Sequence, residues 1–335
     1  MKNNKRNFII VLCLSIIILY LAFKDDFSSK VKYLFSFDIN WLICSFVLMI
    51  AYWILKGIVL YYCTKDLNEK YTIKQGIHLM ITTQFFNAIT PFATGGQPWQ
   101  IYRLKKSGLS LGESTTVVIE DFIAYQIALV LLGIIAVISN HTFNILPQDS
   151  VLRHLVTIGF IINTLVIIVL FLVAFSKNWN KKIIGGTIKI LYKIKIVKDR
   201  KKMLDKSEKF IENFHKSAST LLENKLNYIR LITLNFIALC LLYLIPFTLM
   251  QGLDIYVNPF IIVITSAYVM LIGGVVPIPG GTGGLEYSFM SFFKNFIIGP
   301  KLSIIIIVWR IVTYYFGIII GIIAINIHKE EGKWE

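Results

Sequence analysis

The stretch Pro277-Ile278-Pro279-Gly280-Gly281-Thr282-Gly283-Gly284 interrupts one long apolar segment of the chain, and Thr90-Pro91-Phe92-Ala93-Thr94-Gly95-Gly96 interrupts another. In the hydrocarbon of a membrane, every backbone N–H and C=O group needs a hydrogen-bond partner. A broken helix is therefore stable there only inside protein or beside a water-filled cavity. The two Pro-Gly breaks predict a membrane protein with an internal cavity, which is typical of transporters.

The composition indicates the same class of protein. Of the 335 residues, 56% are hydrophobic and 16% are charged, and the mean hydropathy is +0.68. A helix crosses the hydrocarbon with roughly 20 apolar residues, and such stretches fall at 7–23, 40–62, 114–139, 151–175, 228–250 and 302–326. The segments 73–110 and 257–298 contain the breaks and are candidate re-entrant helix pairs. We therefore expect an all-α, polytopic helical bundle.

The distribution of basic residues predicts the orientation of the chain. Most of the 34 Lys and Arg residues fall in segments that are cytoplasmic if both termini are cytoplasmic. The two halves then run in opposite directions through the membrane. A shift of 188 residues places Pro91 on Pro279 and Gly95-Gly96 on Gly283-Gly284. We expect two inverted repeats, each with a re-entrant broken helix pair.

The same reading divides the chain into four segments. They are the first membrane repeat (1–139), an outer loop and linking span that begins the second repeat (140–176), a basic cytoplasmic linker (177–227) and the remainder of the second repeat (228–335). Residues 177–230 contain 15 basic and five acidic side chains. We expect amphipathic helices there that contact anionic lipid headgroups, and no nucleic acid, because basic cytoplasmic segments are attracted to the membrane surface.

A charge near the centre of a span costs roughly 2.5–3.5 kcal/mol, which makes Glu120, Asp121 and Arg310 candidates for a function. Lys56 also lies within a predicted span. We expect Arg310 to meet an acid of the first half or the anionic group of a substrate. The alternative is a buried ion pair that only holds the two halves together. Glu120 lies nearer to the cytoplasmic end of its span and has the alternative of reaching water.

The breaks themselves predict a binding site. Exposed backbone N–H groups at a helix break can bind an anion, and the glycines that would supply them are Gly95, Gly96, Gly280, Gly281, Gly283 and Gly284. In the alternative, these small residues only allow close helix packing. Glu286 begins the helix after the second break, either as a helix-terminus charge or in gating or proton coupling. Gln97 and Arg103 follow the first break and are expected to line a cytoplasmic vestibule.

No enzyme motif is present. The five histidines are scattered, and the four cysteines stand singly, without the spacing of a metal site or a disulfide framework. The sequence therefore predicts no catalytic residue, no metal and no cofactor.

With Gln97 and Tyr102-Arg103 after the first break and Leu285-Glu286 after the second, the chain resembles the lysylphosphatidylglycerol synthase transmembrane-region family over nearly its whole length. These are flippase-like membrane domains. In the larger members, the multiple peptide resistance factors, the resemblance implies flipping of aminoacylated phosphatidylglycerol, which reduces negative surface charge and gives resistance to cationic antimicrobial peptides.

Two departures from those larger members bear on function. They carry a cytoplasmic acyltransferase domain that uses aminoacyl-tRNA, whereas only His328 to Glu335 follow residue 326 here beyond the last span. Phosphatidylglycerol lysyltransferase activity therefore stays as the enzyme alternative. Glu120-Asp121 also stands where the resemblance implies Glu-Arg.

The sequence thus predicts a flippase or transporter in the bacterial cytoplasmic membrane. It would move a phospholipid, aminoacylated or not, or else a polyprenyl-phosphate-linked lipid. The six glycines would supply backbone donors, Arg103 and Arg310 positive charge, and Asp121 and Glu286 counter-charge for an amine. Oligomeric state is not predicted.

Overall fold

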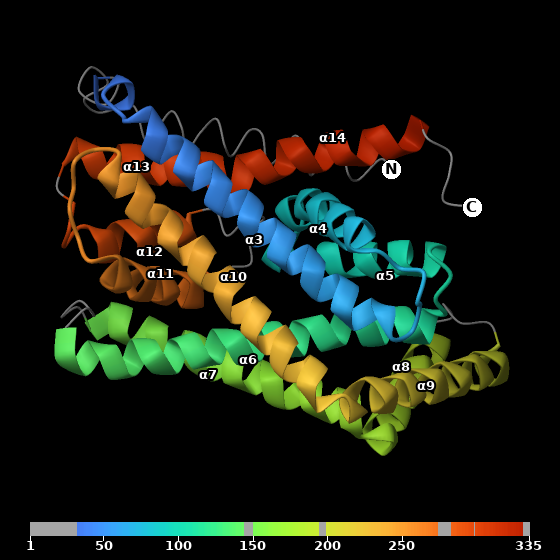
Figure 1. The fold of residues 1–335 in the computed structure, drawn as a ribbon. Helices are drawn as coiled ribbons and strands as arrows, with labels where there is room; N and C mark the ends of the chain where they lie inside the picture. Colours follow the sequence, from blue (N-terminus) through green and yellow to red (C-terminus); the bar gives the residue numbers. More distant parts are fainter. Residues whose placement is uncertain (1–31, 144–149, 194–198, 274–282, 298, 331–335) are drawn as a thin grey trace.

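The computed structural model describes residues 32–143, 150–193, 199–273, 283–297 and 299–330 (Figure 1). Within these ranges the chain is helical apart from short connections, and it contains no strand. The predicted all-α class is confirmed. The predicted span 7–23 and the greater part of the second break, with Gly280 and Gly281, lie outside the described residues.

The elements follow one another in a similar order in the two halves. The first half contains α3 (Ile39–Lys65), α4 (Ile73–Ala88), the short η1 (Pro91–Ala93), α5 (Gly96–Lys106) and α6 (Leu111–Phe143). The span α7 (Ser150–Phe175) begins the predicted second repeat, and two helices follow it, α8 (Lys177–Lys193) and α9 (Arg200–Glu223). The second half contains α10 (Lys225–Gln251), α11 (Pro259–Gly273), α12 (Gly284–Phe293), α13 (Pro300–Arg310), the π-helical η3 (Ile311–Tyr315) and α14 (Phe316–Glu330). The inverted relation of the halves and the four segment boundaries stay predictions.

Five described helical segments are long and apolar enough to cross a membrane. They are Ile39–Lys65, Leu111–Phe143, Val151–Leu170, Lys225–Gln251 and Pro300–Ile327. Each overlaps one of the predicted spans, because hydropathy over roughly 20 residues is the property that a spanning helix must have.

The first Pro-Gly break forms a tight turn between α4 and α5. Phe92, within η1, has a φ of 53°, a left-handed backbone conformation. Thr90 Oγ1 accepts a hydrogen bond from the Gly95 N–H at 2.8 Å, and Asn87 Oδ1 accepts one from the Gly96 N–H at 3.0 Å. A Cβ atom on Gly96 would collide with the Asn87 side chain, so glycine allows α5 to begin close against α4.

The two halves pack against each other over a large surface. The helix α3 packs on α10, and α4 packs on α14 (Figure 1). Buried tyrosines add polar contacts between the halves, since Tyr314 donates to the Ala88 carbonyl at 2.9 Å and Tyr268 donates to the Ala136 carbonyl at 2.6 Å. The halves therefore form one interlocked helical bundle.

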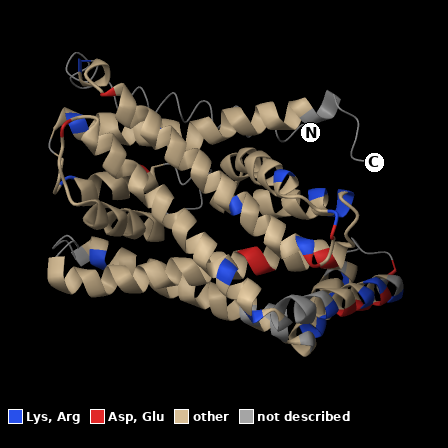
Figure 2. Ribbon diagram, viewed as in Figure 1, with Lys and Arg blue, Asp and Glu red and all other residues tan. Residues whose placement is uncertain are grey.

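The helices α8 and α9 form a charged helical pair at one end of this bundle (Figure 2). Ile188, Ile211 and Phe214 are buried, whereas the basic side chains that the structure describes here are mostly exposed. Thr116 of α6 donates to the Phe214 carbonyl at 3.2 Å and ties the pair to the bundle. The predicted helices are thus amphipathic, and their contact with lipid headgroups stays a prediction.

Candidate functional site

A cavity of about 660 Å³ lies between the two halves of the bundle. Its wall is built by α3, α4, η1, α5 and α6 from the first half and by α7, α10, α11, α12, α13 and η3 from the second. Apolar side chains alternate in it with polar ones, among which are Tyr52, Thr83, Gln84, Asn87, Gln97, Gln100, Gln126 and Asn163. Such a mixed wall can receive a molecule with both polar and apolar parts.

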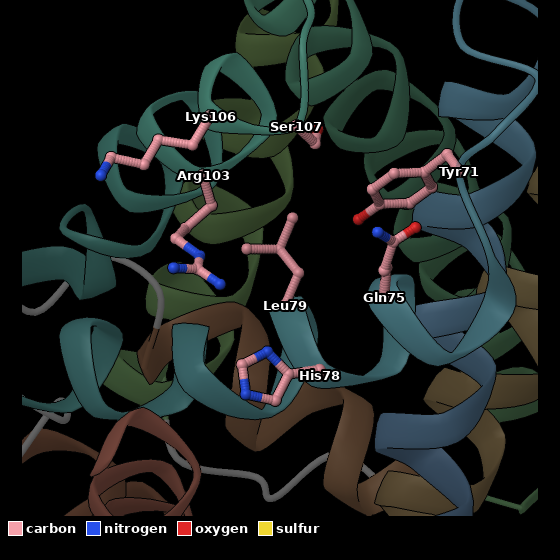
Figure 3. Close-up of a pocket in the computed structure, with 7 residues that line it drawn as sticks. All are labelled: Tyr71, Gln75, His78, Leu79, Arg103, Lys106 and Ser107. Atoms are coloured by element: carbon pink, nitrogen blue, oxygen red, sulfur yellow. The ribbon is translucent and has the colours of Figure 1, made fainter. Parts of the chain in front are cut away.

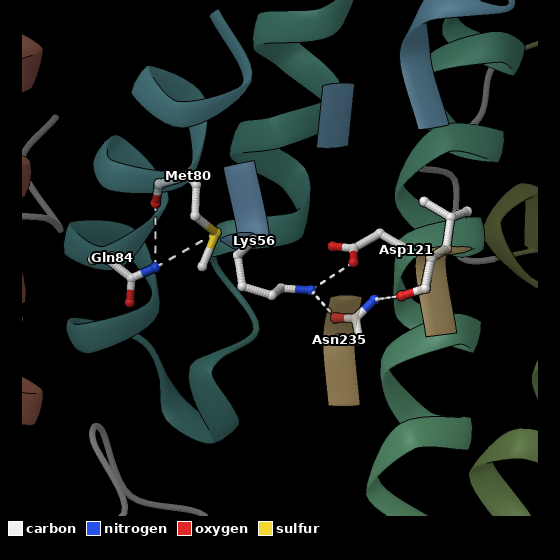
Figure 4. A network of polar contacts seen from close by, with 6 residues as sticks. Lys56, Met80, Gln84, Asp121 and Asn235 are labelled. Atoms are coloured by element: carbon white, nitrogen blue, oxygen red, sulfur yellow. Dashed lines mark hydrogen bonds and ion pairs between the residues drawn. The ribbon is translucent and has the colours of Figure 1, made fainter. Parts of the chain in front are cut away.

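One buried ion pair lies in the first-half wall. Lys56 Nζ of α3 is 2.5 Å from Asp121 Oδ1 of α6 and donates to Asn235 Oδ1 of α10 at 2.7 Å (Figure 4). Asn235 in turn donates to the Leu231 carbonyl at 3.0 Å. The ammonium also lies 5.2 Å from the centre of the Tyr125 ring, a cation–π arrangement. The Lys56 ammonium therefore has two oxygen acceptors and an aromatic ring as partners, although its side chain is only 7% exposed.

Lys56 is the residue of this site that the sequence argument missed. It lies in the middle of the predicted span 40–62, where an ionisable side chain is by itself a sign of function. The presence of Asp121 in another span would have identified a partner of opposite charge.

A second buried ion pair joins Arg310 of the second-half wall to Glu286 behind it. Arg310 Nε, at the end of α13, is 2.8 Å from Glu286 Oε1 in the first turn of α12. Glu286 Oε2 accepts a hydrogen bond from the Gly283 N–H at 2.6 Å. The Arg310 guanidinium also lies 4.4 Å from the centre of the Tyr314 ring. Glu286 thus both caps its helix and holds Arg310 at the cavity wall.

These contacts correct the expected pairing of Arg310. Its acid partner, Glu286, belongs to the second half, so the expected pairing with an acid of the first half is wrong, and its contact with the anionic group of a substrate stays a prediction. Each of the two ion pairs lies within one half, so neither is the pair that joins the halves in the alternative. Glu120 also does not reach water, since it is only 6% exposed.

The predicted glycine and glutamine residues occupy different positions around the cavity. Gln97 lies in its wall. The N–H groups of Gly95 and Gly96 donate within the first break, to Thr90 and Asn87, as described above. At the second break, Gly283 has a φ of 87° and its N–H is bonded to Glu286. These three amides are therefore engaged by protein groups.

Arg103 lies outside the cavity wall, in a small separate pocket near the end of the bundle that carries α8 and α9. Figure 3 shows its guanidinium directed toward Leu79 and His78, with Tyr71 on the opposite side and Lys106 extending away. Burial raises the pKa of the Tyr71 hydroxyl, and the positive charge of Arg103 opposes this rise. The pocket is basic and accessible from outside the cavity.

Among the described residues, no group of three or more His, Cys, Asp or Glu side chains is placed to hold a metal ion.

The fold and the cavity define a polytopic α-helical membrane protein whose two halves enclose a polar space with an ion pair in each half. The chain belongs to the family described as the lysylphosphatidylglycerol synthase TM region, which matches residues 8–321. It is also similar to a UPF0104 membrane protein of Archaeoglobus fulgidus, with 23% identity over 315 residues that cover 88% of this chain and 89% of that protein. The family predicted from the two signatures is confirmed, and it is a lipid-related membrane family.

Proposed function

We propose that the protein is a lipid flippase that moves a phospholipid headgroup across the membrane through the central cavity. The observation that carries this proposal is a cavity of about 660 Å³ whose wall holds Lys56 and Asp121 of one buried ion pair and Arg310 of the other. Ligand sites commonly enclose roughly 300–1,000 Å³, so a glycerophosphate headgroup fits this space.

A headgroup needs such a cavity because its charges are strongly hydrated in water. Moving an isolated charge into hydrocarbon costs tens of kcal/mol. Lys56 and Arg310 supply positive charge for the phosphate, and Asp121 and Glu286 supply negative charge for an amine. The apolar part of the wall accommodates the glycerol and the first part of the acyl chains.

The residues around the breaks have supporting roles in this proposal. Gln97 contacts the headgroup from the cavity wall. Gly95 and Gly96 allow α5 to begin close to the cavity, and Gly283 and Gly284 begin α12, whereas the other proposed donors, Gly280 and Gly281, lie outside the described residues. Arg103 captures the anionic headgroup in its separate basic pocket before the headgroup enters the cavity.

The proposed setting is the bacterial cytoplasmic membrane with both termini in the cytoplasm. The exposed basic side chains of α8 and α9 then lie near anionic headgroups. Through the family resemblance, the proposed flipping of an aminoacylated lipid is linked to resistance against cationic antimicrobial peptides. A phosphatidylglycerol lysyltransferase and a transporter of polyprenyl-phosphate-linked lipids are the alternatives.

The test is reconstitution of the purified protein in vesicles that contain fluorescently labelled phosphatidylglycerol. Leaflet exchange is followed by chemical quenching of the outer label, and the lipids are analysed by mass spectrometry in the same sample. We expect faster exchange than in empty vesicles and no new lipid. Lysyl-lipid formed from supplied lysyl-tRNA would establish the transferase, and exchange confined to a polyprenyl-phosphate probe would establish the other alternative.

Substitutions in the second ion pair connect exchange to the site. Arg310→Ala and Glu286→Ala should each abolish most of the acceleration. Lys181→Ala is the matched control, because Lys181 forms an exposed ion pair with Glu208 on α8 and α9, away from the cavity. Exchange that is unchanged in both cavity variants contradicts the proposed site.

A further inference from the structure

A buried carboxyl group that plays no part in the cavity wall lies directly behind the Lys56–Asp121 pair. Glu120 precedes Asp121 on α6, is 6% exposed and does not line the cavity. Neither of its carboxyl oxygens has a hydrogen-bond partner of acceptable geometry among the described residues. The group that faces it is the buried thiol of Cys63 on α3.

The charged and titratable groups near Glu120 include some close to the protein surface and a pair at the cavity wall. On the outer side are Asp66, which is exposed just beyond the end of α3, and the half-buried Tyr228 near the start of α10. On the inner side is Asp121 with its partner Lys56 at the cavity wall. The charges of Asp66 and Asp121 both act on Glu120, and they do so with the same sign.

The surroundings of Glu120 favour its neutral, protonated form. A buried carboxylate that faces only the weak thiol donor of Cys63 is costly, and two neighbouring acids add repulsion. Lys56, the base at the neighbouring Asp121, is engaged by Asp121 and Asn235. An acid with a purely structural role would be expected to have a stronger donor than a thiol.

We infer that Glu120 is a proton-carrying site that couples the proposed lipid movement to a proton gradient, with one proton moved for each headgroup. This inference rests on the proposed function. It names the proton gradient as the driving force for transport and assigns the proton-carrying role to a residue outside the cavity wall.

The proton transfers balance in the following sequence. Glu120 gives its proton to the Asp121 carboxylate, which becomes neutral and releases the Lys56 ammonium to the phosphate of the headgroup. Glu120, now an anion, takes a proton from the side of Asp66 and Tyr228. When the headgroup leaves on the other side, Asp121 loses its proton to water in the cavity and pairs with Lys56 again.

The coupling can be measured as a leaflet ratio. The protein is reconstituted in vesicles of phosphatidylethanolamine and phosphatidylglycerol with labelled phosphatidylglycerol as the probe, and the membrane potential is clamped with valinomycin and potassium. A gradient of one pH unit then supports a leaflet ratio of up to about ten at one proton per lipid, since one pH unit is a tenfold change in proton activity. We expect the protein to approach this ratio and Glu120→Gln to remain near one.

Glu113→Gln is the matched control on the same helix. Glu113 is half-buried and accepts a hydrogen bond from the Ser110 N–H at 2.7 Å, which a glutamine side chain can also accept. This variant should give the same ratio as the unmodified protein. Accumulation that persists in Glu120→Gln, or exchange in the unmodified protein that ignores the gradient, overturns the inference.

A spectroscopic measurement separates this inference from the proposed function. If no lipid exchange occurs under any condition, the flippase proposal fails, and infrared spectroscopy of the purified protein still tests the proton site. A carbonyl band of a buried, protonated carboxyl group should be present in the unmodified protein and in Glu113→Gln and absent in Glu120→Gln. A band unchanged by Glu120→Gln refutes the protonated site.

Discussion

Removal of Lys56 should separate the structural role of the first ion pair from its role in transport. The side chains of Lys56 and Asp121 are 7% and 11% exposed, so Lys56→Met leaves a nearly dry carboxylate without its cation. Breaking a buried pair in this way costs about 3–5 kcal/mol. We expect a loss near the lower limit, about 3 kcal/mol, because the pair faces a cavity that water can enter.

The double substitution Lys56→Met with Asp121→Asn should recover much of this loss. Both charges are then absent, and the remaining cost is the unpaired carbonyl of Asn235, which lost its donor. An unsatisfied buried group of this kind costs about 1–3 kcal/mol. The coupling energy of the double-mutant cycle should therefore be about 2 kcal/mol.

The measurement is equilibrium unfolding in mixed detergent micelles, made on the two single variants, the double variant and the unmodified protein. Lys181→Ala is the control, because its ion pair with Glu208 is exposed and should leave the unfolding midpoint unchanged. A coupling energy below about 0.5 kcal/mol, the level at which distant sites are additive, refutes the assignment of a desolvated pair. The double variant should be stable yet inactive in leaflet exchange, because no ammonium remains for the phosphate.

Two further predictions concern the backbone and the contact between the halves. Gly283→Ala should destabilise the protein by about 1–3 kcal/mol, because a φ of 87° strains any residue that carries a side chain. Gly185→Ala on α8 is the control and should have little effect, because a Cβ atom there would meet open space. The unfolding midpoints of the two variants are compared. Tyr268→Phe removes the 2.6 Å hydrogen bond to the Ala136 carbonyl and should cost about 0.5–1.5 kcal/mol in the same assay. An unchanged midpoint for Tyr268→Phe would show that this bond contributes no net stability.

The helices could be predicted from the sequence because hydropathy, Pro and Gly act locally. The five described spans appear where roughly 20 apolar residues occur, and the first break occurs at Thr90 to Gly96, where the turn forms. The lengths of the helices were less predictable than their positions. The helix α6 runs from Leu111 to Phe143, beyond the predicted 114–139, because a helix continues past its most apolar part wherever its hydrogen bonds are maintained.

The partners of the charged residues could not be predicted in the same way. The sequence identified Asp121, Glu286 and Arg310 as ionisable groups of the membrane region, and all three lie at the two ion pairs. The 188-residue shift places Asp121 beside Arg310 in register, but positions that match between repeats need not be close in space. Pairing depends on how each helix is rotated, and only the packed bundle fixes that rotation.

The distribution of the two pairs has a consequence for how the halves can move. Each base and its acid belong to the same half, so a movement of one half against the other separates neither ion pair. One polar contact of these pairs, from Lys56 to Asn235 at 2.7 Å, crosses between the halves. Breaking one hydrogen bond to a charged group costs about 1.5–3 kcal/mol, less than the cost of breaking a buried ion pair, about 3–5 kcal/mol. In the proposed transport, a phosphate that takes the place of the Asn235 carbonyl on Lys56 would offset this cost, so that binding of the headgroup itself removes this contact between the halves.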